Sequence, residues 1–153
     1  MIRRAGPADA VAVAEVLITS RRAALGAIPP SVHDDHDVRT WVATTVISTH
    51  EVWVVDEPDA GVVAAMVLAD DWVDQLYVLP GHAGRGLGTQ LLDLAKQQRP
   101  HGLQLWTFAT NTGAQRFYLR HGFVVAQRTD GSGNEEGAPD IRFVWPAPSG
   151  PLG

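Results

Sequence analysis

The stretch that decides the fold reads Leu76-Tyr77-Val78-Leu79-Pro80-Gly81-His82-Ala83-Gly84-Arg85-Gly86-Leu87-Gly88-Thr89. Its first residues complete the run Trp72 to Leu79, which is typical of a strand, and Pro80-Gly81 ends that strand. From Leu87 onward the apolar residues recur at the three-and-four spacing of an amphipathic helix, which stops before Pro100. The sequence therefore predicts a strand, a glycine-rich loop and a helix in succession.

A glycine-rich loop in this position can direct backbone amides at a phosphate group, because the following helix begins there. Two common phosphate motifs do not fit. A Walker A loop ends in Gly-Lys-Ser/Thr, but no lysine follows Gly86, and the dinucleotide fingerprint needs GxGxxG, whereas Gly84, Gly86 and Gly88 give GxGxG. The loop alone is also compatible with a turn that binds no ligand.

A second distinctive segment reads Asn111-Thr112-Gly113-Ala114-Gln115-Arg116-Phe117-Tyr118-Leu119-Arg120-His121-Gly122-Phe123. A purely structural interpretation is available for it. Asn111 would cap a helix, Ala114 and Phe117 would face the core, and Gly122 would end the helix.

Together the two segments resemble the signature of the GNAT superfamily of N-acetyltransferases. That signature is a strand ending in Leu-Tyr-Val-x-Pro, then Arg/Gln-x-x-Gly-x-Gly/Ala, and later Asn-x-x-Ala-x-x-Phe-Tyr-x-x-x-Gly-Phe. Both parts occur here in the family's order and separation. One position departs from the pattern, since Ala83 stands where Arg or Gln is usual. The specific matches lie between Leu76 and Phe123, although the element order agrees over nearly the whole chain.

The resemblance implies that acetyl-CoA is the co-substrate. Amides near Arg85, Gly86 and Gly88 would hold its pyrophosphate, and its pantetheine arm would lie between two splayed central strands. Tyr118 would protonate the departing thiolate. The coenzyme-binding residues implied in this way are Leu76, Tyr77, Val78, Ala83, Gly84, Arg85, Gly86, Leu87, Gly88, Thr89, Asn111, Ala114, Phe117 and Tyr118.

An amine acceptor must lose a proton before or during attack, so a carboxylate is expected near the strand Trp72 to Val78. Asp74 is the first candidate, because strict alternation would place it on one face with Trp72, Leu76 and Val78, and apolar neighbours raise a carboxyl pKa. A solvated aspartate is the alternative interpretation. Glu51 is the second candidate.

By the same resemblance, residues 21–36 and 128–140 would form the acceptor pocket. Arg21 and Arg22 suit an acidic acceptor, whereas Glu135, Glu136 or Asp140 suits a cationic one. The sequence does not choose between these two kinds of acceptor.

The remaining elements complete a mixed α/β (α+β) fold of the order βααβββαβαββ. Strands are expected at 2–5, 52–55, 62–69, 72–79, 103–109, 123–127 and 141–145, and helices at 9–18, from about 34 to 46, from 87 to just before 100, and 112–121. Residues 21–30 and 130–139 are expected to be loops. We predict one domain over residues 1–146 and a flexible tail over 147–153.

Composition limits the function. The 153-residue chain has a net charge of −5, no cysteine and no long apolar run, which argues against nucleic-acid binding, a disulfide framework and a membrane helix, and it favours a cytoplasmic protein. The run His33-Asp34-Asp35-His36-Asp37 contains metal-binding residue types. An acidic helix start explains this run without a metal, so no metal is predicted.

The function predicted from the sequence is direct transfer of acetyl from acetyl-CoA to a primary amine of a small molecule or peptide, in a ternary complex. The alternatives are an acyl-CoA-binding regulatory module without transfer activity and a transferase that uses a longer acyl-CoA. The resemblance also allows a homodimer.

Overall fold

The computed structural model describes residues 1–148. The predicted element order is confirmed. The strands are β1 (Ile2–Arg4), β2 (Glu51–Glu57), β3 (Gly61–Ala69), β4 (Trp72–Val78), β5 (Leu103–Phe108), β6 (Val124–Thr129) and β7 (Asp140–Trp145). The helices are α1 (Ala10–Ala23), α2 (Asp35–Trp41), α3 (Ile47–Thr49), α4 (Leu87–Gln98) and α5 (Thr112–Arg120). A π-helical stretch, Val42–Val46, joins α2 to α3, so the predicted second helix runs through all three pieces.

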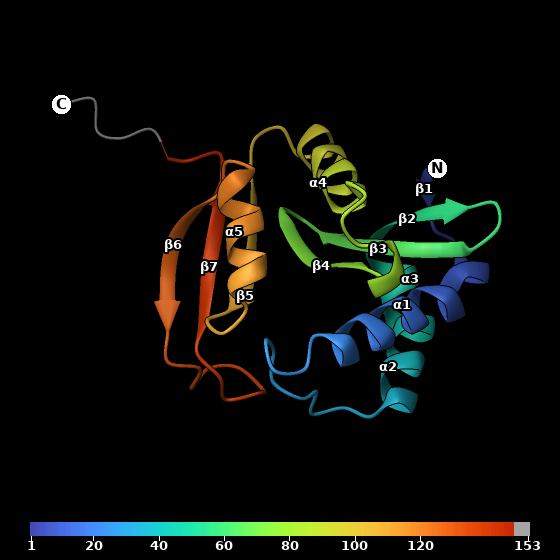
Figure 1. Ribbon diagram of the computed structural model, residues 1–153, viewed down its shortest axis with the longest axis horizontal. Helices are drawn as coiled ribbons and strands as arrows, with labels where there is room; N and C mark the ends of the chain where they lie inside the picture. The colour runs from blue at the N-terminus through green and yellow to red at the C-terminus, as the bar shows by residue number, and fades with distance from the viewer. Residues whose placement is uncertain (149–153) are drawn as a thin grey trace.

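The seven strands form one sheet in the order β1-β2-β3-β4-β5-β7-β6. Strands β2, β3 and β4 make the predicted antiparallel meander, and β6 and β7 pair antiparallel at the other end of the sheet. Strand β4 is parallel to β5. Figure 1 shows the resulting division of the sheet between the β1–β4 half and the β5–β7 half.

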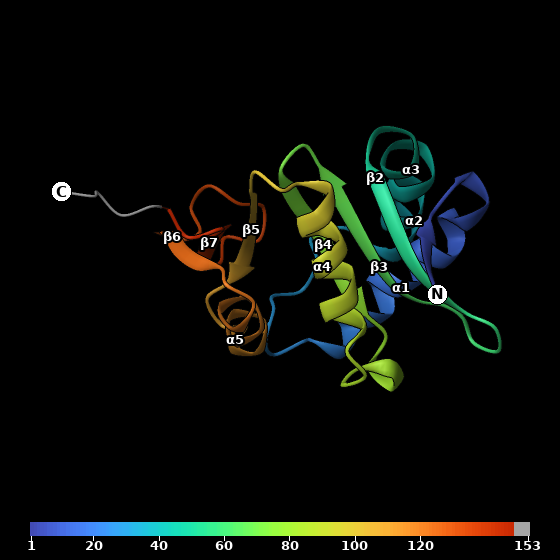
Figure 2. The same cartoon turned by 90° about the horizontal axis from the view of Figure 1, so that it is seen from above.

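Helices cover both faces of the sheet. Helix α4 lies on one face of β3 and β4, α1 to α3 lie on the opposite face, and α5 packs beside β5 and β7 (Figure 2). This arrangement produces two buried clusters. One joins α4, β5, β7 and Tyr118 of α5, and the other joins α1, α2 and the inward side chains of β2 and β3.

The central strands diverge after a single paired position. β4 and β5 are in register only at Trp72 and Gln104, where the Gln104 amide also donates to the Asp71 carbonyl at 2.9 Å. Toward their carboxyl ends the facing backbone edges have no ladder between them. The predicted splay is therefore confirmed, and beyond Trp72 and Gln104 the facing edges of β4 and β5 are not paired with each other.

Helix α1 continues five residues beyond the predicted end at Ile18. The stretch Thr19 to Ala23 contains no glycine or proline, and Arg21 and Arg22 lie in the last turn, where cations interact favourably with the carbonyl end of a helix. The predicted loop over residues 21–30 therefore starts later than expected. Of the predicted tail, residues 149–153 lie outside the described part of the chain. No helix within residues 1–148 is both long and apolar enough to cross a bilayer.

Candidate active site

The glycine loop has a backbone shape that only glycine adopts easily. A 3-10 turn over Pro80–His82 follows β4, and then Gly84 and Gly86 each have φ of +79°. Gly86 is the N-cap of α4 in the left-handed conformation. A β-carbon at either position would meet nothing within 4 Å, so the glycines serve backbone geometry and not close packing.

The backbone amides of this loop point to no internal partner. Among residues 1–148, the amide groups of residues 84–89 make no hydrogen bond, and the first bond of the helix runs from the Gln90 amide to the Gly86 carbonyl at 3.0 Å. Unpaired amides at the positive end of a helix dipole attract anions. The loop is therefore a suitable cradle for a phosphate group.

The one cation within the loop is already engaged. The Arg85 Nη2 atom lies 2.7 Å from the Glu57 Oε1 atom, and its Nη1 atom lies 2.7 Å from His82 Nδ1. Anion binding at this loop therefore depends on amides more than on the Arg85 charge. Ala83 adds no polar side chain.

The two sequence motifs meet in space at the start of α4. A β-carbon on Gly88 would be 3.4 Å from the Phe117 ring of α5. His121 extends the contact, because its Nδ1 lies 2.7 Å from the Phe117 carbonyl and its Nε2 lies 3.1 Å from the Thr89 hydroxyl. A carbonyl can only accept, so Nδ1 carries a proton, and in the neutral tautomer Nε2 accepts from the Thr89 hydroxyl. His121 was not predicted as a site residue, because it occupies a variable position of the motif.

Tyr118 combines a buried ring with an unpaired hydroxyl. The side chain is 8% exposed and packs edge-on against Phe117 and Phe123, with ring centroids 5.2 and 5.4 Å away. Its hydroxyl makes no hydrogen bond with any of the described residues. Burial raises the pKa of Tyr118, and nearby Tyr77 raises it further. The phenol therefore stays protonated at neutral pH and is free to donate.

Asn111 occupies the helix-capping position of α5. Its Oδ1 atom accepts from the Ala114 amide at 3.2 Å, which is the bond expected of an N-cap. The capping interpretation is thus confirmed for Asn111, while its contact with the coenzyme stays a prediction.

Asp74 lies in a β-bulge of β4. Val73 pairs with Leu68 and Gln75 pairs with Val67, which leaves Asp74 without a partner. Because of this extra residue, Val73, Leu76 and Val78 pack in the same cluster. The prediction that Trp72, Asp74, Leu76 and Val78 all share a face is therefore wrong, since a bulge interrupts strict alternation.

The Asp74 carboxylate nevertheless has an unusual environment. Burial raises the pKa of Asp74, and His50 opposes part of that rise from 3.4 Å between its Nε2 and the Asp74 Oδ2. The predicted rise in pKa is present, and it comes from partial burial, since the Asp74 side chain stays 39% exposed.

Glu51 is held in a structural ion pair. It accepts hydrogen bonds from the Trp53 indole at 2.7 Å and from Arg99 at 3.1 Å. Burial would raise the pKa of Glu51, but these bonds and the positive charge outweigh it and lower the pKa. A low pKa and two fixed partners do not suit a general base.

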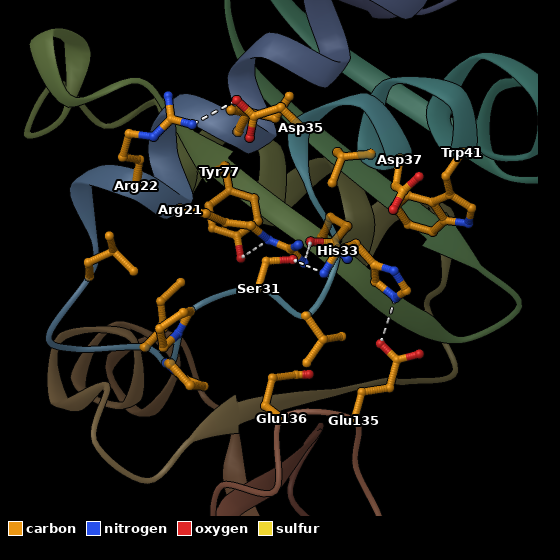
Figure 3. A pocket seen from close by; sticks show the side chains of 18 of the residues that line it. Arg21, Arg22, Ser31, His33, Asp35, Asp37, Trp41, Tyr77, Glu135 and Glu136 are labelled. Atoms are coloured by element: carbon orange, nitrogen blue, oxygen red, sulfur yellow. Dashed lines mark hydrogen bonds and ion pairs between the residues drawn. The ribbon is translucent and has the colours of Figure 1, made fainter.

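A cavity of about 580 Å³ opens on the α1–α2 side of β4 (Figure 3). Both segments expected at the acceptor pocket line it. The α1–α2 segment meets the β6–β7 loop where His33 Nε2 lies 3.1 Å from Glu135 Oε2. The same segment meets the β5–α5 connection, where the Thr110 hydroxyl donates to the Ala27 carbonyl at 2.7 Å. The apolar part of the wall comprises Ile18, Leu25, Ile28, Pro29, Pro30, Val32, Val38, Trp41 and Phe108.

A neighbouring cavity of about 600 Å³ lies between β5 and the β6–β7 loop. Its wall includes Asp140, which was a candidate for binding a cation. The Asp140 carboxylate instead accepts bonds from the Thr129 hydroxyl and the Asn134 amide. These bonds fix the base of the loop and leave Asp140 a structural role.

The acidic run His33 to Asp37 starts a helix. Asp34 caps α2 by accepting from the Asp37 amide at 2.8 Å. Nowhere in residues 1–148 do three metal-binding side chains come together.

Comparison with known proteins agrees with this geometry. Residues 48–125, just over half of the chain, match the family model described as an acetyltransferase (GNAT) domain. No curated protein matches the chain significantly in sequence.

Solved structures share the fold. Apo YjaB from Escherichia coli has a TM-score of 0.76 and 21% identity, covering 95% of this chain and 96% of that one. A GCN5-related N-acetyltransferase from Rhodopseudomonas palustris has a TM-score of 0.75 and 22% identity, covering 94% and 93%. YncA from Salmonella typhimurium, solved with its cofactor acetyl-CoA, has a TM-score of 0.68 and 22% identity, covering 94% and 91%. With the family model, the glycine loop and the splayed sheet in agreement, the chain belongs to the GNAT acetyltransferase family.

Proposed function

We propose that this chain transfers an acetyl group from acetyl-CoA to a primary amine of a small molecule or peptide, directly and in a ternary complex, and that residues 1–146 are the catalytic domain. The observation that carries the proposal is the row of unpaired amides at residues 84–89, beside the opening between β4 and β5. Its structural neighbour YncA binds acetyl-CoA on the same fold.

The donor would be bound mainly by backbone groups. Amides of Arg85, Gly86 and Gly88 would bind the pyrophosphate, since they converge at the positive end of α4. The pantetheine arm would lie along the free edge of β4 near Val78, in the manner of an added strand. Phe117 and Asn111 would border the arm from α5.

The chemical step needs one proton donor and one proton acceptor. The amine nitrogen attacks the thioester carbonyl and forms the C–N bond, and the tetrahedral intermediate then breaks its C–S bond. Tyr118 would donate its hydroxyl proton to the departing sulfur, which is a role that suits a phenol kept protonated by burial.

Asp74 would accept the proton that the amine loses. Its pKa is raised, which makes it a better base than an ordinary aspartate when it is ionised. Because Asp74 does not line the cavity directly, while its neighbour Gln75 does, the proton would pass through a water molecule. Glu51 is not proposed as a base, because Arg99 and Trp53 already hold it.

The experiment has two stages. Calorimetric titration with acetyl-CoA tests the donor site without knowledge of the acceptor, and thiol release with a panel of amines then tests transfer. Micromolar binding followed by amine-dependent thiol release supports the proposal. Binding without transfer to any amine would indicate a regulatory module, faster release from a longer acyl-CoA would change the donor, and absence of binding would overturn the proposal.

A further inference from the structure

The cavity beside β4 contains one arginine that no carboxylate among the described residues contacts. Two arginines and one histidine line the cavity. Arg22 pairs with Asp35 at 2.7 Å, and His33 lies 3.1 Å from Glu135. Arg21 makes no ion pair with any carboxylate in residues 1–148, and Figure 3 shows it beside Tyr77.

The contacts of Arg21 leave most of its donors unused. Its Nε donates to the Tyr77 hydroxyl at 3.3 Å, and one terminal nitrogen donates to the Gln75 amide oxygen at 3.4 Å. Both partners are neutral and both distances are at the long end of the normal range. A guanidinium has five N–H donors in a planar fork that matches a carboxylate. The site is therefore ready for an anionic group.

We propose that Arg21 binds a carboxylate of the acceptor, and that the acceptor is a free amino acid with an apolar side chain. This inference rests on the proposed acetyl transfer and specifies its substrate class. Arg21 reaches the cavity because α1 extends to Ala23. The Arg21 guanidinium donates to the hydroxyl of Tyr77 on β4.

The position of Arg21 would place the acceptor carboxylate beside β4. The Arg21 guanidinium contacts Gln75 and Tyr77 of β4, which both line the cavity, and the neighbouring Ser20 hydroxyl donates to the Val78 carbonyl at 3.3 Å. Val78 lies next to the proposed donor site, since a β-carbon on Gly88 would be 3.9 Å from the Val78 side chain and 3.4 Å from Phe117. A small acceptor that presents an amine to that site and a carboxylate to Arg21 is an amino acid, whereas a polyamine has no carboxylate.

The rest of the wall indicates what kind of side chain fits. Apolar groups such as Ile28, Val38 and Trp41 form most of the surface away from Arg21, and the volume is within the usual range for small-ligand sites. The rim also carries Asp37 and Glu136, which form no ion pair within the described residues. These acids favour the approach of an ammonium group and disfavour a second carboxylate.

The experiment compares each apolar amino acid with its own amide in the thiol-release assay, using saturating acetyl-CoA. The two substrates keep the amine and the side chain and differ only in the carboxylate charge. The wild type should use the free acid with a kcat/KM roughly 100-fold higher, because a charged hydrogen-bond pair is lost in the amide. Equal use of acid and amide would overturn the inference.

Variants locate the effect on one side chain. Arg21→Gln should raise KM for the free acid roughly 100-fold, so that the acid-to-amide ratio of kcat/KM falls close to one. Arg22→Gln is the matched control, since Arg22 lines the same cavity but is paired, and it should change KM less than about 3-fold. A carboxylate preference that survives in Arg21→Gln would contradict the assignment.

Direct binding separates this inference from the proposed function. Calorimetry of the wild type with CoA present measures binding of the free acid and the amide without turnover. Preferential binding of the acid supports the carboxylate site even if no acetyl transfer occurs, in which case only the proposed function fails. Transfer to amines together with equal binding of acid and amide would overturn the carboxylate site and leave the proposed function intact. Thermal unfolding checks that Arg21→Gln is folded.

Discussion

The glycine loop and the cavity beside β4 are built in opposite ways. The loop offers amides from consecutive residues, 84–89, which have no internal partners. The cavity is lined by side chains from four separate segments, and two of these segments meet where His33 Nε2 lies 3.1 Å from Glu135 Oε2. Loop amides can therefore bind a phosphate group whatever the side chains are, whereas binding in the cavity depends on the particular side chains that line it. The following substitutions test whether the donor is bound by backbone groups and the acceptor by side chains.

Tyr118→Phe should have the largest effect on turnover, because it removes the proposed proton donor. Loss of a general acid costs roughly 100- to 1,000-fold in kcat. Acetyl-CoA affinity should not change, because no contact with the phosphates is lost. Rapid-quench or thiol-release kinetics give kcat, and calorimetry gives the affinity. Equal losses in kcat and affinity would contradict the acid role.

Stability provides a control for Tyr118→Phe. The hydroxyl makes no hydrogen bond within residues 1–148, so its removal should not lower the melting temperature. The pH profile gives a second check. Because the pKa of Tyr118 is raised above its ordinary value of about 10, no loss of activity from its ionisation should appear below that pH.

Gly86→Glu should weaken acetyl-CoA binding roughly 100-fold, which corresponds to about 2.7 kcal/mol. The new side chain adds a negative charge at the proposed phosphate site and requires φ of +79°. Calorimetric titration measures the change. Gly137→Glu is the matched control, because Gly137 also has positive φ, at +63°, and open space, but it lies in the β6–β7 loop. Similar weakening in both variants would mean that strain or charge alone caused the effect.

Asp74→Asn tests whether the Asp74 side chain accepts the proton that the amine loses. Asp74 must be ionised to accept a proton, so wild-type kcat/KM should fall as the pH drops through its pKa, which lies above the ordinary value of about 3.9. In Asp74→Asn, kcat/KM should no longer fall with the ionisation of residue 74, and it should be roughly 10-fold lower than in the wild type at neutral pH. Steady-state kinetics from pH 4 to 8 measure both effects.

Asp71→Asn is the control for Asp74. Asp71 sits at the tip of the same hairpin, where its carboxylate accepts from the Gln104 amide at 3.1 Å. Its replacement should leave the pH profile unchanged. An acid limb that persists unchanged in Asp74→Asn would assign it to another group, such as the acceptor amine itself.

The sequence predicted the backbone part of the site well and the side-chain part poorly. Amides follow the chain, so Gly84 and Gly86 could be placed in a loop between a strand and a helix, where the structure has them. Phosphate binding by that loop stays a prediction. Apolar patterns and turn residues likewise placed each of the seven strands and the four predicted helices, although neither 3-10 turn was predicted. The predicted and observed boundaries of these elements differ. Helix α1 ends at Ala23 and not at the predicted Ile18, because no glycine or proline follows Ile18 within the helix.

Three features depended on contacts that no local pattern encodes. The bulge at Asp74 adds one residue and changes which side chains share a face, although Trp72 to Val78 is an ordinary strand sequence. The pairing of Arg22 with Asp35 leaves Arg21 unbalanced, but adjacent arginines look equivalent in the sequence. His121 joins Thr89 to α5 from a position with no fixed identity in the motif.

Arg85→Ala should have the smallest effect, and it tests the comparison most directly. Arg85 is the cation nearest to the proposed phosphate site, yet it is about half exposed and already paired with Glu57. A surface ion pair of this kind is worth about 0–1 kcal/mol. If amides form the cradle, the acetyl-CoA dissociation constant should rise less than about 3-fold, whereas Gly86→Glu raises it far more. A rise as large as that of Gly86→Glu would show that the donor region, like the acceptor cavity, depends on a particular side chain.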